Sequence, residues 1–553
     1  MQSISAFQEA RARYQPKLPA VLCEGKIGIQ LGDTTQAVAD EEEIRKMFPL
    51  TYGQRIAALT VGEDELSSVP LRVGVVLSGG PASGGHNVIA GLFDALKSAN
   101  NDSRLFGFLQ GPKGIIQGKY KELTAEVIDA YRNTGGFDMI RSGRDKIETA
   151  EDLAACEKTF AYMGLQGLVI VGGDDSNTNA AVLAEHLRAH GSATSVIGVP
   201  KTIDGDLKNE WIDTSFGYDT ACKTYSELIG NICRDAASAA KYWHFIKLMG
   251  RTASYVTLEC VLQTHPNVAL ISEEIQSQGI TIEEIVDLIV DVVVKRAEVG
   301  RNYGVVVVPE GLPEFIPDIK AMIDELSTIL GQDEAYIQSL PDHSERLQYL
   351  STQLSEASAK VYSSLPPETQ EVLLTRDSHG NVPLSQVETE RLLIDLVSDR
   401  IRLLNAHKEK KIPFSPLSHF FGYEGRCTPP SNFDADYCYS LGYTAVQLIR
   451  ANLTGYTVSI RGLIKPSDQW IAGGIPTSMM LCMEMRKGRP TLVIKKALVD
   501  LDGRAFKIYA TSRGEWALKD SYLFPGPIQY FGPGEVSDCP PITLTLEDRS
   551  VMD

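Results

Sequence analysis

The feature that most constrains the fold is a series of short apolar runs, most of which end in glycine or at a proline. The series begins with LRVGVVLSGG (residues 71–80) and continues with GLVIVGG, SVIGVPK, HFIKLMG, NVALISE and YGVVVVPEG. Amphipathic helical stretches such as HNVIAGLFDALKS and NTNAAVLAEHLRAH lie between the runs. Continuous apolar strands that alternate with helices are typical of a parallel sheet that is buried on both faces. The sequence therefore predicts a doubly wound α/β fold.

Two α/β domains can be placed from where these runs begin and stop. Because the chain has 553 residues and a typical domain has about 100–200, more than one domain is expected. Residues 71–215 are predicted to form one α/β domain, which residues 427–475 complete. Residues 216–426 are predicted to form a second one, and the polar helical pattern at about 315–412 is interpreted as a helical insertion in it.

The flanking segments have a different texture. Residues 1–70 are predicted to be a polar, partly helical N-terminal extension, and residues 476–553 a strand-rich C-terminal segment. The start, MQSISAFQEARARYQ, lacks the apolar stretch of a secretory signal, and no run approaches the ~18 apolar residues of a membrane span. Nine scattered cysteines without a CxxC pair predict reduced thiols. The sequence thus predicts a cytoplasmic protein without a membrane partner.

The charge balance restricts the partners further. The chain carries 53 basic and 71 acidic residues, which gives a formal net charge of −18. A nucleic-acid partner is not expected, because a phosphate backbone needs a basic surface. A small anionic substrate remains compatible with this charge, because a local cationic pocket can lie on an acidic protein.

Two glycine-rich stretches, LSGGPASGGHN and VGGDDSNTN, each follow an apolar run and precede a helical pattern. At the carboxyl edge of a parallel sheet, glycines let the backbone approach an anion, and a helix N-terminus supplies N–H donors. The first stretch is equally compatible with a plain tight turn. In the second, Asp174 and Asp175 are compatible with Mg²⁺ binding or with capping of the following helix, and the residues alone leave both interpretations open.

The stretch VPKTIDGDLKNE places one cation and two carboxylates directly after another apolar run. Phosphoryl transfer needs charge neutralisation, positioning and a base on the attacking hydroxyl. Lys201 could neutralise a transferring phosphoryl group. One of Asp204 and Asp206 could take the proton of the hydroxyl while the other orients it. A charged surface turn is the alternative interpretation.

Three further loops put an arginine beside glycine, namely KLMGR with Arg251, GYEGR with Arg426 and NTGGFDMIRSGRDK with Arg144. Glycine allows close approach, and the guanidinium group offers two donors to phosphate oxygens. These loops predict that the protein binds a polyanion. His86 and His419 lie near glycine-rich loops, but the nine histidines show no metal-ligand spacing, so a helix-start role and a packing role are favoured.

The order of LSGGPASGGHN, GGDDSNTN, PKTIDGD, MGR, PEG and YEGR resembles the phosphofructokinase family over about residues 73–434. GGDD with PKTIDGD is similar to the pyrophosphate-dependent branch. GGFDMIRSGRDKIET, the chain length and the helical insertion are similar to its long form, diphosphate–fructose-6-phosphate 1-phosphotransferase, which includes the catalytic β subunits of plants. One departure is Ser83, where the family commonly has proline.

The resemblance implies two doubly wound, Rossmann-like three-layer domains, the first for pyrophosphate and Mg²⁺ and the second for fructose 6-phosphate. It implies a reversible, Mg²⁺-dependent transfer of a phosphoryl group from pyrophosphate to the 1-hydroxyl of fructose 6-phosphate, a step of glycolysis and gluconeogenesis. Family dimers imply a homodimer or larger homo-oligomer, in which Lys241 and Tyr242 reach a neighbouring subunit's site.

The family's functional residues can be placed on this sequence in three groups. The residues implied in catalysis are Asp204 as the base, Asp206, Lys201 and Arg144. The residues implied in donor binding are Gly80, Asp175 and Lys201, with Asp174 as the metal ligand. The residues implied in sugar-phosphate binding are Thr202, Ile203, Asp204, Lys241, Tyr242, Met249, Gly250, Arg251, Glu310, Tyr423, Glu424, Gly425 and Arg426.

The resemblance also gives Asp175 and Lys201 a role in donor choice, because ATP-using relatives have glycine at both positions. The Asp175 carboxylate would fill the room that ATP needs and repel its α-phosphate, while Lys201 would face the smaller donor. The alternatives are the same reaction with ATP, a catalytically inactive regulatory subunit, and a sugar-phosphate sensor without turnover. Asp175 and Lys201 argue against the first, and the intact TIDGD stretch argues against the other two.

Overall fold

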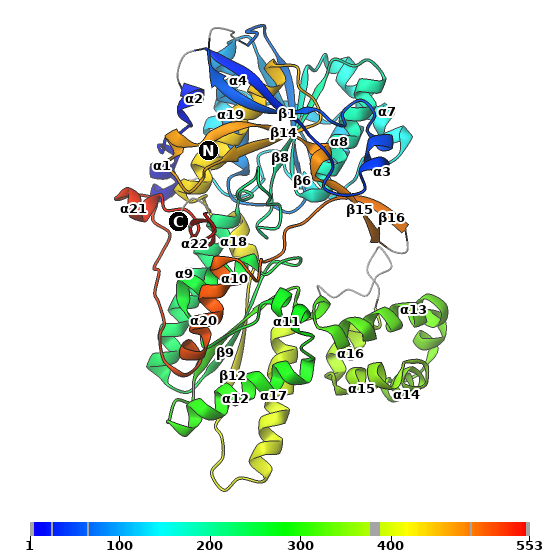
Figure 1. The fold of residues 1–553 in the computed structure, drawn as a ribbon, viewed down its shortest axis with the longest axis vertical. Coiled ribbons are helices and arrows are strands. Elements are labelled where there is room, and N and C mark those ends of the chain that lie inside the picture. Colours follow the sequence, from blue (N-terminus) through cyan, green and yellow to red (C-terminus); the bar gives the residue numbers. More distant parts are fainter. Residues whose placement is uncertain (1–4, 24–25, 63–65, 376–386, 487–488, 549–553) are drawn as a thin grey trace. The chain divides into compact units, whose positions relative to one another are not determined.

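The computed structural model describes residues 5–23, 26–62, 66–375, 387–486 and 489–548. Parts of the expected N-terminal extension, helical insertion and C-terminal segment lie outside the described residues. The chain divides into two compact units (Figure 1). Unit 1 comprises Met1–Ala221, Glu424–Ala497 and Ile528–Asp553, and unit 2 comprises Cys222–Tyr423 and Leu498–Pro527.

Unit 1 is built on a ten-stranded sheet. In spatial order its strands are β1 (Ile27–Thr34), β2 (Arg55–Val61), β14 (Ile471–Pro476), β13 (Tyr456–Arg461), β8 (Ser195–Pro200), β7 (Gly167–Gly172), β3 (Arg72–Ser78), β4 (Arg104–Phe108) and β5 (Tyr120–Glu122), with β6 (Ser142–Gly143) paired to β3. The strands from β13 to β4 run parallel, and the flanking pairs are antiparallel. A separate hairpin consists of β15 (Leu481–Arg486) and β16 (Arg489–Ile494).

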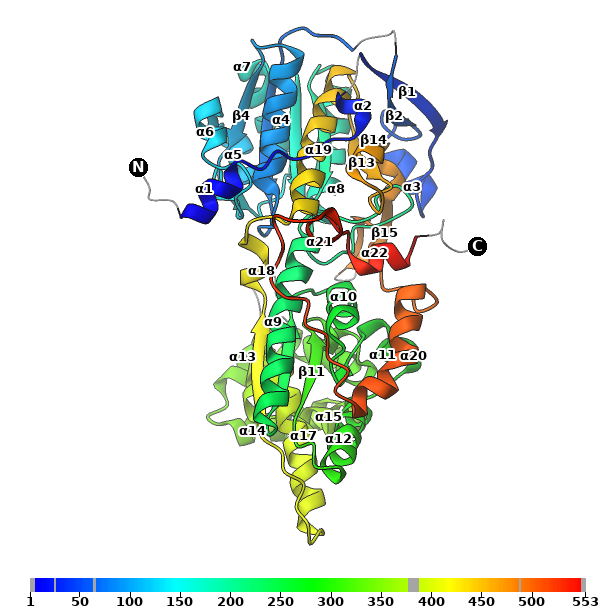
Figure 2. The ribbon, with the colours of Figure 1, turned by 90° about the vertical axis from the view of Figure 1, so that its left-hand side faces the viewer.

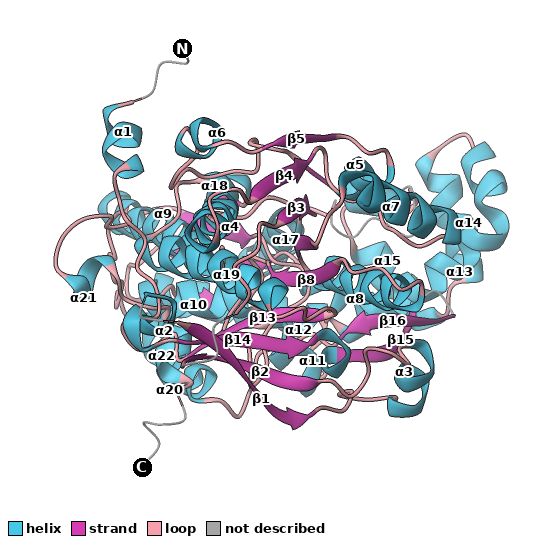
Figure 3. Cartoon of the chain, turned by 90° about the horizontal axis from the view of Figure 1, so that it is seen from above, coloured by secondary structure: helices cyan, strands magenta, loops and turns pink. Residues whose placement is uncertain are grey.

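Helices cover both faces of the parallel strands, with α4 and α19 on one face and α7 and α8 on the other (Figure 3). Helix α4 begins after Gly84, whose φ of +106° and proximity to Cys438 leave no room for a Cβ. The helices of unit 1 are α1 (Ala6–Ala12), α2 (Ala20–Cys23), α3 (Glu41–Met47), α4 (Gly85–Ala99), α5 (Pro112–Ile116), α6 (Ala125–Asp129), α7 (Ala150–Met163), α8 (Asp174–Ala189), α19 (Asn432–Arg450), α21 (Gly534–Ser537) and α22 (Ile542–Leu546), with short 3₁₀ turns at Ser467–Gln469 and Thr477–Met480.

Unit 2 contains a four-stranded sheet in which every pair is parallel. Its spatial order is β10 (Val268–Ala269), β11 (Gly304–Pro309), β9 (Trp243–Leu248) and β12 (Pro416–Phe421). Helices α9 and α10 pack together, and α12 and α17 lie side by side (Figure 2). The helices and the 3₁₀ turn of this unit are α9 (Tyr218–Ala239), α10 (Tyr255–Thr264), α11 (Ser272–Gln278), α12 (Ile282–Glu298), η1 (Leu312–Glu314), α13 (Pro317–Ser339), α14 (His343–Gln353), α15 (Glu356–Ser364), α16 (Pro367–Leu373), α17 (Thr389–Ala406) and α20 (Arg504–Leu518). Helix α18 (Tyr423–Cys427) contains the division between the units, and α9 begins in unit 1.

The described helices between residues 315 and 412 share one hydrophobic core with the unit 2 sheet. Leu326 and Leu350 of these helices are buried in the same cluster as Trp243 and Phe245 of β9. At ~25 cal/mol per Å² of buried apolar surface, packing of this kind is the main stabilising contribution that such helices gain. The helices therefore form part of the unit 2 core.

The two flanking segments differ from their expected texture. The described part of residues 1–70 contains the helices α1, α2 and α3, as a partly helical segment should, but it also contributes two strands to the sheet. Strand β2 pairs with β14, so that Ala57 lies opposite Gly474. Residues 476–553 contain the β15–β16 hairpin followed by helices, and buried Phe506, Tyr509 and Trp516 recur on one face of α20. Among the described residues, no helix combines the length and the apolar character that crossing a membrane would require.

Candidate active site

Three adjacent parallel strands of unit 1 end at the same edge of the sheet. They are β3, β7 and β8, and β3 has β4 on its other side. The chain continues from β3 to β4 on one side and to β7 and β8 on the other, so the strand order reverses at β3. Ligands of open α/β sheets bind at the carboxyl ends of the strands at such a point. Ser176 at the start of α8 donates a hydrogen bond of 2.8 Å to Ser78 at the end of β3, which ties the first two loops together.

Two glycines after β3 let cationic side chains approach the backbone. A Cβ on Gly79, whose φ is +84°, would lie 3.2 Å from Lys201 Nζ. A Cβ on Gly80 would lie 3.1 Å from Arg426 Nη1. The structure therefore brings Gly80, Lys201 and Arg426 together within unit 1, and larger residues at either glycine would displace the cations.

Lys201 is the most buried cation at this edge, with 7% of the residue exposed. Its ammonium group donates a 2.8 Å hydrogen bond to the carbonyl oxygen of Gly80. Burial lowers the pKa of Lys201 to about 8; Asp204 opposes this shift, and Arg426 reinforces it. Among the described residues, no ion pair joins Lys201 to a carboxylate, and Asp204 and Asp174 offset its burial only in part.

Asp174 and Asp175 are the first two residues of α8, and neither of them caps this helix, because Gly173 holds the N-cap position. Carboxylates in a first turn are stabilised by the positive end of the helix dipole. The Asp175 side chain is 53% exposed and lies 3.7 Å from Lys146 Nζ. The Asp174 side chain is 23% exposed, and its oxygen is a ligand type that divalent cations such as Mg²⁺ accept.

Lys496 is a site residue that the sequence analysis missed. It lies two residues after β16, and its Nζ is 3.4 Å from Asp174 Oδ2 and 3.3 Å from Asp206 Oδ2. Burial acts to lower the pKa of Lys496, but Asp174, Asp206 and Asp204 outweigh it, so the pKa is raised. The available signal was its position, because KK follows the apolar run TLVI as other site residues follow their runs.

Three hydrogen bonds hold the backbone of the TIDGD turn in place. Thr202 Oγ1 accepts a 3.1 Å hydrogen bond from the amide of Asp204, and Ser215 Oγ donates to the Thr202 carbonyl at 2.8 Å. The amide of Ala497 donates to the carbonyl of Asp206 at 2.8 Å. Asp206 is buried and Asp204 is half-buried, so Asp204 is the more accessible of the two carboxylates.

Arg144 and Ser83 border the first glycine loop. Arg144 is exposed and follows β6, and β6 pairs with β3 so that the amide of Gly79 donates to the Gly143 carbonyl at 2.8 Å. Ser83 is fully buried and donates a 2.7 Å hydrogen bond to the Thr428 carbonyl. A serine at this position is therefore satisfied within unit 1.

In unit 2, the MGR and PEG stretches meet at the ends of β9 and β11. The amide of Gly250 donates a 3.1 Å hydrogen bond to Glu310 Oε2, and the amide of Gly311 donates to the Gly250 carbonyl at 3.3 Å. Met249 donates from its amide to the Phe421 carbonyl of β12 at 3.0 Å. Arg251 is exposed, which leaves its guanidinium accessible to solvent.

The remaining expected site residues differ in their exposure to solvent. Tyr423 and Glu424 are exposed at the start of α18, and Gly425 is buried. Lys241 is exposed, and its Nζ lies 4.7 Å from the ring centroid of half-buried Tyr242. Ile203 is 6% exposed, so its contribution to a ligand site is limited to its backbone and its packing.

The two histidines have structural surroundings. His86 is fully buried, its Nδ1 lies 2.8 Å from Thr134 Oγ1, and burial lowers its pKa to about 4. His419 Nε2 lies 2.9 Å from His244 Nδ1, and burial lowers the pKa of His419 as well. Both arrangements agree with the packing and helix-start roles that the sequence favours.

Glycine loops, a buried lysine and accessible carboxylates at a parallel-sheet edge define a phosphate-binding α/β protein equipped for phosphoryl transfer. Residues 72–363 match the family model described as phosphofructokinase, and the chain belongs to this family.

Comparison with individual proteins gives matches over nearly the whole chain. The chain is 52% identical to the pyrophosphate–fructose 6-phosphate 1-phosphotransferase of Porphyromonas gingivalis, over 98% of this chain and 99% of the relative. It is 49% identical to subunit beta 1 of the Arabidopsis thaliana enzyme of that name, over 98% and 94%. A crystal structure of pyrophosphate-dependent phosphofructokinase from Nitrosospira multiformis has a TM-score of 0.54 at 15% identity, over 86% of this chain and 98% of that chain. These comparisons confirm the expected family and its fold.

Proposed function

We propose that this protein transfers a phosphoryl group reversibly from pyrophosphate to the 1-hydroxyl of fructose 6-phosphate, giving fructose 1,6-bisphosphate and phosphate. The observation that carries the proposal is the buried Lys201 ammonium on the Gly80 carbonyl, with Asp204 three residues further along the chain. The reaction agrees with the names of relatives that match this chain at about half identity over almost its full length.

Within unit 1, each charged group is assigned one task. Asp204 is accessible and its backbone is held by Thr202, so we propose that its carboxylate takes the proton of the 1-hydroxyl. Asp206 is buried and contacts Lys496, so we assign it the support of this turn. Lys201, together with Arg144, binds the phosphate oxygens and neutralises the charge that develops on them.

We propose Asp174 as the ligand of a divalent cation, specifically Mg²⁺. Its carboxylate oxygens are the donor type that Mg²⁺ requires, and Lys496 beside Asp174 Oδ2 shows that the position attracts positive charge. When bound, such an ion would neutralise negative charge on the donor phosphates. Lys496 keeps Asp174 and Asp206 close together despite their like charge.

Asp175 is proposed to exclude ATP. Its half-exposed carboxylate follows Asp174 on α8 and would meet the α-phosphate of a nucleotide donor, while Lys146 restrains it. We expect Asp175→Gly combined with Lys201→Gly to weaken the use of pyrophosphate and to admit some turnover with ATP. The measurement is kcat/KM with each donor. Full pyrophosphate activity in the double variant would contradict the assignment.

The unit 2 residues are proposed to bind fructose 6-phosphate. Met249, Gly250 and Arg251 form a backbone-anchored loop with Glu310, whose carboxylate accepts from Gly250 and can accept from sugar hydroxyls with its other oxygen. The resemblance assigns the 6-phosphate to Arg426, whose Nη1 lies beside the donor loop of unit 1. The other proposed contacts are Tyr423 of unit 2 and, in unit 1, Thr202, Ile203, Glu424 and Gly425.

We propose a homodimer or larger homo-oligomer in which exposed Lys241 and half-buried Tyr242 complete a neighbouring subunit's site. Mixing a Lys241→Ala variant with an Asp204→Asn variant tests this, since hybrid oligomers would regain part of the lost activity. All nine cysteines lie within described residues and none of them forms a disulfide, which agrees with the proposed cytoplasmic location.

The first experiment is a coupled assay of the purified protein with fructose 6-phosphate and Mg²⁺, offered pyrophosphate or ATP separately. We expect turnover with pyrophosphate alone, and Asp204→Asn, purified identically, controls for contaminating host enzymes. Turnover with ATP alone would overturn the donor assignment. If neither donor gives turnover, the result would contradict the proposed activity and favour the regulatory-subunit alternative.

A further inference from the structure

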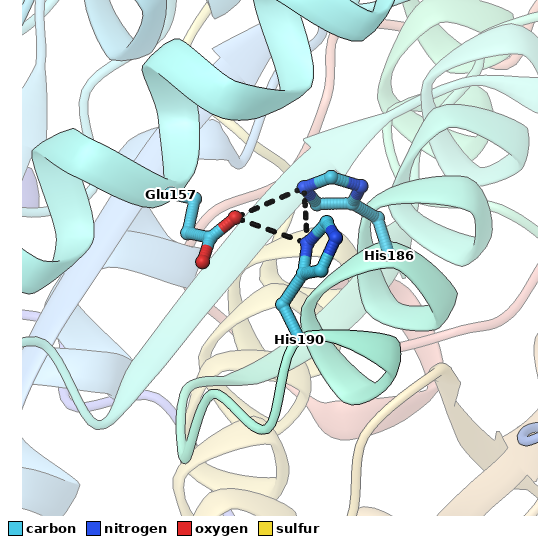
Figure 4. Close-up of side chains that lie close together, drawn as sticks. All are labelled: Glu157, His186 and His190. Atoms are coloured by element: carbon cyan, nitrogen blue, oxygen red, sulfur yellow. Dashed lines mark hydrogen bonds and ion pairs between the residues drawn. The ribbon is translucent and has the colours of Figure 1, made fainter.

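Three potential metal ligands converge at the end of α8 that is opposite to Asp174. Glu157 extends from α7, His186 from the last turn of α8, and His190 follows directly after that helix (Figure 4). The expectation that no histidines have a metal-ligand spacing was wrong here, because His186 and His190 are four residues apart and lie on one face of the helix end. Glu157 Oε2 lies 3.2 Å from His186 Nε2 and 3.1 Å from His190 Nδ1, and the two ring nitrogens are 3.0 Å apart. The phosphoryl-transfer site does not use these residues.

Hydrogen bonds alone do not explain this triangle. A carboxylate only accepts, and a neutral imidazole carries one N–H and one lone pair. If both rings donate to Glu157, their two N–H groups oppose each other. If one ring accepts instead, its lone pair faces the carboxylate oxygen, and if both rings are protonated, two cations lie in contact. With Glu157 ionised, every distribution of protons over the two rings leaves at least one of the three contacts repulsive.

A single cation makes all three contacts favourable, because each atom then offers it a lone pair. Zinc binds imidazole nitrogen at about 2.0–2.1 Å and carboxylate oxygen at about 2.0–2.2 Å. Ligand atoms at these distances around one ion are separated by roughly 2.9–3.4 Å, depending on the coordination angle. The separations of 3.0–3.2 Å among Glu157, His186 and His190 lie within this range.

We propose that Glu157, His186 and His190 bind a divalent transition metal of the zinc class and that the ion clips α7 to α8. Two imidazoles and one carboxylate suit zinc better than magnesium, which prefers oxygen ligands only. The side chains are 36%, 17% and 50% exposed, so water can reach the ion and complete its coordination. At ~1.5 Å per residue, α8 separates this site from Asp174 by roughly 24 Å. The proposal is independent of the proposed reaction.

The direct test is zinc binding to the full-length protein after treatment with a chelator, in competition with a chromophoric chelator and with Mg²⁺ in excess. We expect one zinc site per chain that weakens at least tenfold in Glu157→Gln and in His186→Ala. His407→Ala is the matched control, because His407 is exposed and lies outside this cluster. Equal zinc affinity in wild type, Glu157→Gln and His186→Ala would overturn the proposal.

Co²⁺ provides a control for the free thiols, three of which are exposed. A site of two imidazoles and one carboxylate gives only weak visible bands, whereas a thiolate ligand adds an intense near-ultraviolet charge-transfer band. We expect the weak visible bands in wild type and their loss in His186→Ala. A thiolate band that His186→Ala leaves unchanged would assign the metal to cysteine and overturn the site.

Binding of the ion between α7 and α8 can also be tested by a structural measurement that does not depend on enzyme activity. Openings that separate α7 from α8 must release the ion, so free Zn²⁺ at one hundred times its Kd slows amide hydrogen exchange through such openings by about 100-fold. We expect this slowing in wild type and in His407→Ala, but not in His186→Ala. Exchange that zinc leaves unchanged in α7 and α8 of wild type would contradict the clip.

Discussion

Two buried lysines, one in each unit, have very different surroundings. Lys247 lies in β9 of unit 2, and its Nζ is 3.0 Å from Glu390 Oε2 on α17, with both side chains almost fully buried. Lys201 follows β8 in unit 1 and donates to the neutral carbonyl of Gly80. Burial costs both ammonium groups their hydration, but only Lys247 forms an ion pair with a carboxylate; Lys201 has only the weaker attraction of Asp204 and Asp174, which Arg426 and Arg144 oppose.

The difference distinguishes a lysine whose charge stabilises the fold from a lysine whose charge can bind a ligand. In the buried ion pair of Lys247 with Glu390, the two charges neutralise each other, so an anionic ligand is not needed. Lys201 is left with an incompletely compensated charge at a glycine-lined sheet edge, where an incoming phosphate can complete it. The same substitution at the two lysines should therefore affect stability in one unit and activity in the other.

The largest expected effect on stability belongs to Lys247→Met. Removing one partner of a buried ion pair leaves Glu390 buried without compensation, which costs about 3–5 kcal/mol. The measurement is urea-dependent amide exchange in peptides that cover β9. The double variant Lys247→Met with Glu390→Gln should recover most of the loss, and a single variant as stable as wild type would contradict the structural role.

Lys201→Met should give the reverse result. We expect kcat with pyrophosphate to fall by about 10²–10³-fold, the range for removing one preorganised stabiliser of transition-state charge. The free energy of unfolding should change by less than ~1 kcal/mol, because methionine replaces the alkyl chain and the desolvation cost of the ammonium disappears. A large loss of stability with activity retained would contradict the proposed functional role of Lys201.

Lys496→Met should have a smaller effect on catalysis. We expect kcat/KM for pyrophosphate to fall roughly 10- to 100-fold, about 1.4 kcal/mol for each factor of ten, because Asp174 and Asp206 lose the cation between them. The Mg²⁺ concentration that gives half-maximal activity should fall, since a competing cation is removed. Lys496→Arg should restore part of the rate. The matched control is Lys495→Met, because Lys495 is an exposed neighbour of equal charge, and equal effects at both positions would contradict the assignment.

Sequence patterns predicted the central part of the fold because its strands are buried on both faces. RVGVVLS and GLVIVGG form β3 and β7, because a short continuous apolar run has few stable structures other than a buried strand. The edge strand β1 was missed because most of its residues are at least half-exposed, so IGIQLGDT resembles a polar segment. Helix α20 was missed because its buried aromatic residues are separated by polar ones and follow an apolar strand.

The candidate site shows the same limit. Residues that lie within one loop, such as Lys201 and Asp204, were found because their spacing is visible in the sequence. Lys496 lies almost 300 residues beyond them in the chain, and only the pairing of β15 with β16 and their packing beside α8 bring it to Asp174. Contacts over such separations depend on tertiary structure and have no local pattern.

A buried carboxylate in unit 1 extends the comparison to acidic groups. Asp436 Oδ1 accepts hydrogen bonds of 2.8 Å from the Tyr14 hydroxyl and the Lys17 amide. Burial raises the pKa of Asp436 to about 7; these hydrogen bonds and the Lys17 ammonium oppose the shift, and Asp538 adds to it. The folded protein therefore holds the proton more tightly than the unfolded chain, so this contribution to stability is full below about pH 4 and is lost as the pH rises to about 7.

Asp436→Asn should remove that pH dependence while it keeps the oxygen that accepts from Tyr14 and Lys17. The difference in unfolding free energy between variant and wild type should shift in favour of the variant between pH 4 and pH 7. Its slope should be at most about 1.4 kcal/mol per pH unit, because one proton is involved. Asp102→Asn is the control, since Asp102 is exposed and should show no such slope. Equal pH profiles for Asp436→Asn and wild type would mean that this buried carboxylate, like Lys247, is already compensated in the folded protein.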